Sequence, residues 1–368
     1  MHNQAGETQT GSGPAPALVP TLVGTPPLTG TEAIRSVPPP RFLQIEPVGQ
    51  CNLRCQMCPI QFRRDGPPHG PPAFLPYEEF CRLIDEAPGV PELHLQGLGE
   101  PLMHPRFFDL VAYAVAKGMR VTTNTNLTLM TSLLSERCIR SGLHYLHVSL
   151  DGATAPTYER IRTGASFLRV ARHLEQLLAA RSRLDSPTPA VGLVMVVMRQ
   201  NLHELPELVR LARQWGLDEV FVQHLCHEYG EATLPVQYRS MKEFVETETL
   251  VAEDADRVAR YFGEARDAAN ALNVRLRLPR VWRTPHPPGT PGRQRCDWPW
   301  RGMYLSYQGL AMPCCMIGTP DRFNFGSVAG KNTTALWYGA EYETFRSQLE
   351  SDEPPDICRS CSLYKGTF

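Results

Sequence analysis

The sequence predicts an α/β fold: a partial, TIM-like (β/α)6 barrel followed by a small C-terminal domain. From Arg41 onward, short apolar runs alternate with amphipathic stretches, which is the pattern of repeated βα units and a parallel sheet. Six such units can be recognised, fewer than the eight that close a TIM barrel. After a proline-rich stretch over 278–295, the chain changes character and carries clustered cysteines.

The predicted strands are the short apolar runs at 42–48, 92–96, 120–123, 145–150, 191–198 and 219–224. Helices with amphipathic periodicity are expected between them, at 77–86, 105–116, 130–140, 167–183 and 205–215. A long charged helical segment is expected after the sixth strand, over about 238–272. The predicted domains are therefore a leader at 1–40, a barrel at 41–277, a linker at 278–295 and a cysteine-bearing domain at 296–368.

The leader contains eight prolines, five glycines and six threonines, without helical or strand periodicity. Such a segment buries too little apolar surface to offset the entropy lost on ordering. We therefore expect residues 1–40 to be disordered, although an overextended start would give the same composition.

Composition excludes several classes of protein. The formal charge is −1, so no polyanion partner such as a nucleic acid is expected. The longest apolar run, 191–198, is far shorter than the roughly 20 residues that span a bilayer, and the start lacks the pattern of a secretory signal. The 11 cysteines are clustered in a long chain, which favours metal ligation in a reducing compartment over a disulfide framework. We expect a soluble, cytoplasmic protein.

Three cysteines follow the first predicted strand in a C-x3-C-x2-C pattern: Cys51, Cys55 and Cys58. Thiolates favour iron-sulfur clusters or zinc. Three of them can hold three irons of a cubane cluster and leave the fourth iron open. A zinc site completed by a distant His or Cys is the alternative, although structural zinc is typically bound by paired C-x2-C arms.

This cysteine loop at the end of a first barrel strand resembles the radical S-adenosylmethionine (radical SAM) superfamily. The resemblance implies a 4Fe-4S cluster whose open iron is chelated by the amino and carboxylate groups of SAM. It also implies that one electron from the cluster cleaves SAM to a 5'-deoxyadenosyl radical. The electron would come from a donor such as flavodoxin or ferredoxin.

The segment after the second strand, 97–101, reads Gly-Leu-Gly-Glu-Pro. It resembles the Gly-Gly-Glu motif that holds the SAM amino group in this family, with Leu98 as a departure from the pattern. The resemblance therefore assigns Gly99 and Glu100 to SAM binding. An ordinary turn is the alternative for this segment.

Polar residues also follow the third and fourth strands, where the family places SAM contacts. The resemblance assigns this role to Asn124, Ser149 and Asp151, and it assigns pairing with the SAM carboxylate to Arg162. Strand-end turns and helix caps would explain the first three equally well. Arg160 lies close to Arg162 in sequence, and surface arginines are common.

A second cysteine set comprises Cys296, Cys314, Cys358 and Cys361. Four thiolates can fully ligate another cluster, and a four-cysteine zinc ribbon is the alternative. The C-x12-G-x4-C spacing through Gly309 resembles the SPASM or twitch extension of radical SAM enzymes. The resemblance implies one auxiliary 4Fe-4S cluster, because Thr367 stands where a full SPASM domain would place a further cysteine.

The other cysteines have weaker assignments. Cys81 and Cys138 lie in amphipathic segments and are expected in the core. Cys315, beside Cys314, is an alternative ligand. Cys226 follows the sixth strand, where a thiol gives a hydrogen atom to the substrate radical in some radical SAM epimerases. A non-catalytic pocket thiol is the alternative for Cys226.

Cys226 has three polar neighbours that could bind substrate or act as a base, namely His224, His227 and Glu228. Together these features predict a radical SAM oxidoreductase, dehydrogenase-like, in which the auxiliary cluster accepts an electron, anchors the substrate or relays electrons. We expect a small-molecule substrate such as a sugar or aminocyclitol, because 40 leading residues are too few for a peptide-recognition domain. A SPASM maturase of peptides or proteins, a radical epimerase and a non-enzymatic zinc or iron-sulfur module are the alternatives.

Overall fold

A computed structural model describes residues 37–63, 73–225, 229–281, 295–329 and 332–367 of the chain. Most of the predicted leader and linker lie outside the described residues. So do Cys226, His227 and Glu228, three of the residues predicted to act on substrate.

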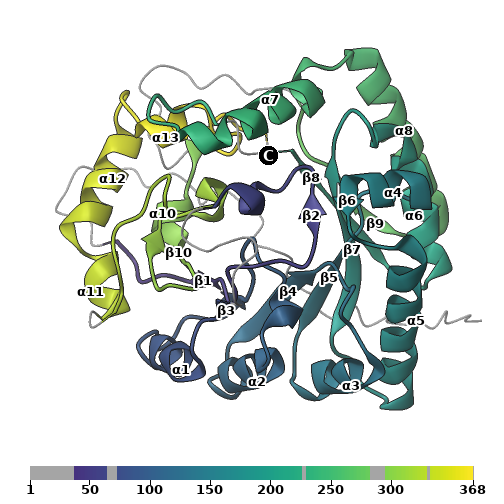
Figure 1. The fold of residues 1–368 in the computed structure, drawn as a ribbon, viewed down its shortest axis with the longest axis horizontal. Helices are drawn as coiled ribbons and strands as arrows, with labels where there is room; N and C mark the ends of the chain where they lie inside the picture. Colours follow the sequence, from purple (N-terminus) through teal and green to yellow (C-terminus); the bar gives the residue numbers. More distant parts are fainter. Residues whose placement is uncertain (1–36, 64–72, 226–228, 282–294, 330–331, 368) are drawn as a thin grey trace, which may run out of the picture. The chain divides into compact units, whose positions relative to one another are not determined.

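A nine-stranded sheet organises the described chain, in the order β11-β10-β1-β3-β4-β5-β7-β8-β9 (Figure 1). All neighbouring strands are parallel except β10 and β11. The six predicted strands are present as β1 (Phe42–Ile45), β3 (Glu92–His94), β4 (Arg120–Thr125), β5 (Tyr145–Ser149), β7 (Ala190–Val197) and β8 (Glu219–His224). The prediction of a partial barrel of βα units is confirmed.

Helices cover the outer face of this sheet, as Figure 1 shows. The five predicted between the strands are α1 (Tyr77–Asp85), α2 (Phe107–Ala116), α3 (Ser132–Arg140), α5 (Phe167–Arg183) and α6 (Leu205–Gln214). Side chains alternate along each strand. On β5, Leu146 and Val148 belong to the main apolar core, whereas Tyr145 and His147 lie on the opposite face, towards the interior of the barrel.

Three short strands extend the sheet beyond the predicted six: β9 (Arg275–Arg277), β10 (Gly302–Leu305) and β11 (Ala311–Met312). Strand β10 pairs in parallel with β1, so the sheet crosses the predicted boundary between the barrel and the cysteine-bearing domain. The strand that leads into the first cysteine set is thus hydrogen-bonded to the strand that leads towards Cys314. The division of the chain into domains stays a prediction.

The charged helical segment predicted over about 238–272 is helical but interrupted. The chain forms η4 (Val236–Tyr238), α7 (Arg239–Glu248), η5 (Leu250–Ala252) and α8 (Ala255–Leu272). The break occurs because Thr249 is extended and its hydroxyl accepts a hydrogen bond from the Val251 amide. The Asp254 carboxylate then caps α8 by accepting from the Arg257 amide at 2.7 Å.

Shorter elements complete the described chain. They are β2 (Arg54–Cys55), η1 (Pro59–Phe62), η2 (Pro101–Met103), α4 (Ala155–Ile161), β6 (Arg162–Thr163), η3 (Leu202–Glu204), α10 (Trp298–Arg301), η6 (Cys315–Ile317), α11 (Thr333–Trp337), α12 (Ala340–Glu350) and α13 (Asp356–Arg359). Within the described residues, no helix is both long enough and apolar enough to cross a bilayer.

Candidate functional site

The first cysteine set lies on the loop that leaves β1, at the carboxyl end of the strand. Its backbone is held by a small antiparallel sheet in which Cys55 of β2 pairs with Arg162 of β6. The Gln56 amide also donates to the Ile161 carbonyl at 3.0 Å. The loop is therefore fixed by a segment that follows the fourth predicted strand, more than a hundred residues away in the chain.

Polar groups surround the three thiols. The Cys51 Sγ accepts from the Leu53 amide at 3.4 Å and from Asn126 Nδ2 at 3.7 Å. The Cys55 Sγ lies 3.9 Å from Arg162 Nη1. Burial raises the pKa of all three thiols, to about 12 for Cys58. The charge of Glu100 raises the pKa of Cys51 further, and the charge of Cys55 raises that of Cys58. Three soft donors on one loop, with N–H groups directed at two sulfurs, fit an iron-sulfur cluster held by three cysteines.

The Gly99–Glu100 turn packs directly against the residues that precede the cysteine loop. A Cβ on Gly99 would lie 2.0 Å from the Val48 carbonyl oxygen, so the close approach requires glycine. The Glu100 amide donates to the Gln50 carbonyl at 2.9 Å. This turn and the cysteine loop thus form one unit at the carboxyl ends of β1 and β3.

The Glu100 carboxylate is buried and bonded to its own turn and to the end of β4. It accepts from the Thr125 hydroxyl at 2.6 Å, the Asn126 amide at 2.8 Å and the Leu102 amide at 3.1 Å. Burial raises the pKa of Glu100, and these hydrogen bonds oppose the shift. Glu100 therefore connects the turn after β3 with Asn126, the residue that donates to Cys51.

Asn124 and Ser149 lie on the same face of neighbouring strands. The register pairs Asn124 with His147, and Ser149 follows two residues later on β5. Both side chains are half-buried, and the Asn124 Oδ1 has no hydrogen-bond partner among the described residues. A buried amide oxygen without a partner is an acceptor position for a ligand.

Asp151 and Arg162 form a buried ion pair with 2.7 Å between Oδ2 and Nε. The Asp151 Oδ1 also accepts from the Val196 amide at 2.8 Å, and its carbonyl accepts from Asn201 Nδ2 at 2.9 Å. Burial raises the pKa of Asp151 and the charge of Arg162 opposes the shift. The carboxylate is thus committed to protein partners, and its effect is to hold the guanidinium of Arg162 beside Cys55.

The second cysteine set is brought together from three parts of the C-terminal region. Glycine is required in the β10–β11 hairpin, where Gly309 has a φ of +72° and closes the turn through a 2.8 Å hydrogen bond to the Ser306 carbonyl. Cys314 follows this hairpin, and Cys358 and Cys361 lie in and after α13.

The four thiols of this set interact electrostatically. Burial raises the pKa of Cys296, Cys314 and Cys358. The charges of other members of the set raise the pKa of Cys296 and Cys358 further, and the charges of Cys315 and then Cys361 raise that of Cys314. Cys314 is buried, whereas Cys315 begins the short helix η6. Among the described residues, no three His, Cys, Asp or Glu side chains converge as tightly as the ligands of a single metal ion do. Four thiolates in one apolar region fit a cluster ligated fully by cysteine.

Sequence reasoning did not single out several residues that build the first site. Asn126, which donates to Cys51, is one of them. Glu46 directly follows β1, and its carboxylate forms a fully buried ion pair with Arg63 at 2.6 Å. The carboxylate also accepts a hydrogen bond from the Leu98 amide. An acidic residue inside the apolar run predicted as a strand at 42–48 was the available signal, because a buried charge needs a partner.

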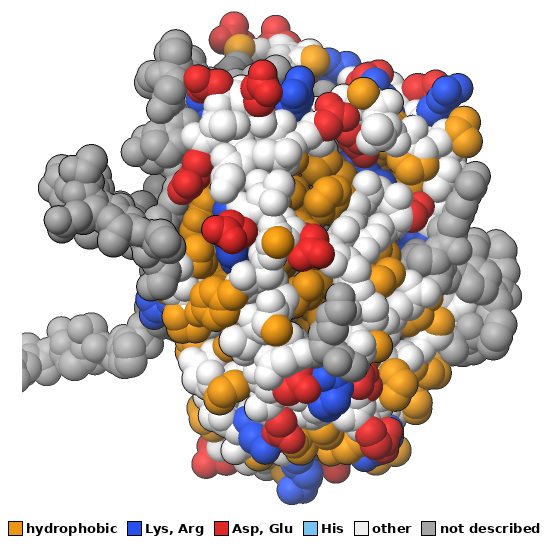
Figure 2. Space-filling model, turned by 90° about the vertical axis from the view of Figure 1, so that its left-hand side faces the viewer, with side chains coloured by type: hydrophobic (Ala, Val, Ile, Leu, Met, Phe, Trp, Pro, Cys, Tyr) orange, Lys and Arg blue, Asp and Glu red, His pale blue; other side chains and the backbone are white. Residues whose placement is uncertain are grey.

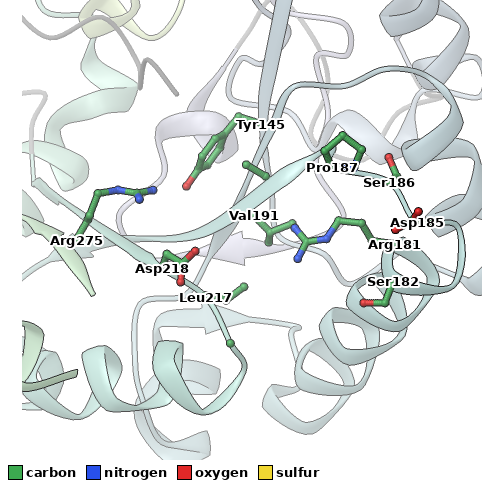
Figure 3. Close-up of a pocket in the computed structure, with 12 residues that line it drawn as sticks. Tyr145, Arg181, Ser182, Asp185, Ser186, Pro187, Val191, Leu217, Asp218 and Arg275 are labelled. Atoms are coloured by element: carbon green, nitrogen blue, oxygen red, sulfur yellow. The ribbon is translucent and has the colours of Figure 1, made fainter. Parts of the chain in front are cut away.

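A cavity of about 520 Å³ lies at the opposite, amino-terminal end of the strands (Figure 3). Its walls include Tyr145, Arg181 and Arg275. Both arginines already have protein partners, since Arg181 donates to the Pro189 carbonyl and Arg275 pairs with Glu219. In barrels of this kind, chemistry is located at the carboxyl ends of the strands, so the cysteine loop marks the candidate active site.

The face shown in Figure 2 carries acidic and basic side chains interspersed, with apolar side chains gathered in patches between them. Among the described residues on this face, no broad basic area is visible. This distribution agrees with a formal charge of −1.

Two family models match the chain. The model of the radical SAM superfamily matches residues 45–212, and the SPASM model, an iron-sulfur cluster-binding domain, matches residues 296–362. These matches contain all seven cysteines of the two sets.

Two of three similar curated proteins match most of the chain, and the third matches half of it. A tungsten-containing aldehyde ferredoxin oxidoreductase cofactor-modifying protein from Pyrococcus furiosus is 25% identical, over 88% of this chain and 87% of its own. A PqqA peptide cyclase from Granulibacter bethesdensis is 27% identical, over 89% of this chain and 80% of its own. The mycofactocin maturase MftC of Mycobacterium tuberculosis is 31% identical over 50% of this chain and 44% of its own.

Among solved structures, Streptococcus suis SuiB bound to S-adenosylmethionine has a similar fold. The TM-score is 0.65 at 16% sequence identity, and the match covers 89% of this chain and 72% of SuiB.

Proposed function

Since the chain belongs to the radical SAM superfamily and carries a C-terminal SPASM domain, we propose that it is a maturase that modifies a peptide or protein substrate at a C–H bond. The pairing of a three-cysteine site with a four-cysteine site in one chain carries this proposal. When bound, a 4Fe-4S cluster with SAM supplies a 5'-deoxyadenosyl radical, and an auxiliary cluster supplies a second redox centre.

Different residues of the chain would hold the first cluster and contact SAM. Cys51, Cys55 and Cys58 would hold the first cluster. Asn124 and Ser149 have the exposure and the hydrogen-bonding groups to contact SAM directly. Gly99 lets the turn after β3 approach the Val48 carbonyl closely, because it has no side chain.

Glu100, Asp151 and Arg162 complete the proposed SAM site. Arg162 would face the SAM carboxylate with a guanidinium fixed by Asp151. Glu100 would shape the turn beside the SAM amino group through its bonds to Leu102 and Asn126.

A peptide or protein substrate is favoured by relatives that span nearly the whole chain, among them a protein named as a peptide cyclase. A second relative, matched over half of this chain, is named as a maturase. These relatives support the peptide alternative better than the sugar or aminocyclitol substrate expected from the sequence. A dehydrogenase-like net reaction also stays a prediction.

An anaerobic reconstitution tests the proposal. We expect about eight irons per chain, and formation of 5'-deoxyadenosine from SAM with dithionite or reduced flavodoxin as donor. Short peptides encoded beside the gene are then incubated with the loaded enzyme and examined by mass spectrometry. A peptide that loses hydrogen in step with 5'-deoxyadenosine formation supports the proposal. Conversion of an aminocyclitol, with every peptide unchanged, would overturn it, as would stoichiometric zinc without SAM cleavage.

The epimerase alternative depends on Cys226, which lies outside the described residues. It predicts that Cys226→Ala abolishes product formation and that solvent deuterium enters the product of the unmodified enzyme. Peptide modification by the Cys226→Ala variant at an unchanged rate would exclude this role.

A further inference from the structure

The segment that follows β8, residues 229–238, runs along the auxiliary cysteine region. The Gly230 amide donates to the Ser360 hydroxyl at 3.1 Å, and Ser360 lies between Cys358 and Cys361. The Ala232 amide donates to the Asp356 carboxylate at 2.6 Å. Two backbone amides of this segment are therefore bonded to side chains beside the auxiliary cysteines.

A buried ion pair adds a third connection. Glu231 and Arg322 lie 2.7 Å apart, with side chains 2% and 4% exposed. Arg322 also donates to the carbonyl of Ile317 at 2.9 Å, at the end of the helix η6 that begins with Cys315. Removing two charges from water is costly, so such a pair persists only where geometry and extra hydrogen bonds compensate. Here the pair fixes residue 231 against the loop that follows Cys314.

Two tyrosines of the same segment, Tyr229 and Tyr238, also contact the auxiliary cysteine region. The Tyr229 and Tyr238 rings are stacked at 5.8 Å with 14° between their planes, and the Arg322 guanidinium lies 4.3 Å from the centre of the Tyr229 ring. The Tyr238 hydroxyl lies 2.8 Å from the Thr319 hydroxyl and donates to Asp321 at 2.9 Å. Both rings are fully buried.

Tyr238 also contacts residues of the first cysteine loop. The centres of the Tyr238 and Phe62 rings lie 6.2 Å apart in an edge-to-face arrangement. Phe62 ends the short helix η1, which begins after Cys58. Tyr238 also shares an apolar cluster with Leu53, Cys55 and Met57 of the cysteine loop. One side chain is thus hydrogen-bonded to the auxiliary region and packed against the loop of the first set.

We infer that residues 229–238 form a strap that couples the two cysteine sites, with Glu231 and Tyr238 as positioning residues. This inference rests on the proposed function, which assigns an iron-sulfur cluster to each of the two cysteine sites. When the auxiliary site is intact, Arg322, Thr319 and Asp321 hold the strap, and the strap supports the loop that carries Cys58. Loss of the auxiliary cluster should therefore loosen the strap and weaken SAM binding at the distant first site.

Hydrogen exchange of the loaded full chain tests the coupling without any substrate. We expect Cys361→Ala to speed amide exchange in 230–238 by about tenfold or more, because the local opening of the strap becomes easier. Unchanged exchange in 230–238, in a variant shown to have lost the auxiliary iron, would overturn the inference. This result is independent of which molecule the enzyme modifies, so a failure of the peptide proposal leaves the test intact.

Variants of the strap supply the reciprocal test while keeping all seven ligands. We expect Glu231→Gln and Tyr238→Phe to retain the iron content, to raise the Kd for SAM several-fold, and to alter the change that SAM produces in the electron paramagnetic resonance spectrum of the first cluster. The matched control is Glu253→Gln, which breaks a 2.7 Å ion pair with Arg257 on α8. Equal SAM responses in the strap variants and in this control would overturn the inference.

Discussion

The two cysteine sets of this chain are built in opposite ways. The first set is local, with three cysteines on one loop, and polar groups of Asn126, Glu100 and Arg162 surround it. The second is assembled from segments far apart in sequence, and its neighbours Tyr304, Met312, Met316, Ile317 and Leu363 form a largely apolar cluster. A site that must bind SAM needs polar partners and an open coordination position, whereas a fully ligated cluster is best protected by apolar surroundings.

The largest expected effect follows from removing a ligand of the first set. In Cys55→Ala, the open-iron site is lost, so formation of 5'-deoxyadenosine should fall to background and about four of eight irons should disappear. Anaerobic iron analysis and chromatography of the products measure both. SAM cleavage by this variant would show that the first cysteine set is not the site where SAM is cleaved.

The corresponding change in the second set should separate radical formation from product formation. We expect Cys314→Ala to lower the yield of modified product by about a hundredfold or more. The rate of SAM cleavage should fall by less than about tenfold, because the strap couples the two sites only in part. Cleavage and product are quantified in the same reaction. Equal losses of both would mean that the two sites do not have separate roles.

A smaller effect is expected from Asp151→Asn, which keeps the shape of the side chain and removes its charge. Because Asp151 holds Arg162 beside Cys55, the Kd for SAM should rise by about ten- to a hundredfold with iron content unchanged. Titration of SAM followed by electron paramagnetic resonance measures the affinity, and Glu253→Gln serves as the control. An unchanged Kd would show that the ion pair does not position Arg162 for SAM.

The smallest effect is expected at the neighbour of a ligand. Cys315 begins η6 whereas Cys314 is buried and extended, so Cys315→Ala should keep all irons and the full rate of SAM cleavage. Iron analysis beside Cys314→Ala checks this expectation. A loss of about four irons would identify Cys315 as the auxiliary ligand.

Much of the barrel was predictable because its signals are local. The six strands and five intervening helices follow from periodicity within each segment, and the strand predicted at 219–224 matches β8 residue for residue. Strand β10 was missed because its partner is β1, and such a pairing leaves no periodic signal in a four-residue strand. The break between α7 and α8 was missed because Thr249 and Asp254 act through caps rather than periodicity.

By itself, the sequence determined the βα architecture and the three-cysteine loop, because apolar periodicity and cysteine spacing are local features of the chain. It predicted the membership of the second cysteine set. Only the tertiary structure decided that Asp151 holds Arg162 and that Glu231 is paired with Arg322. The second pairing joins residues 91 positions apart in the chain. Folding selects both pairs through burial, because a buried charge needs a partner.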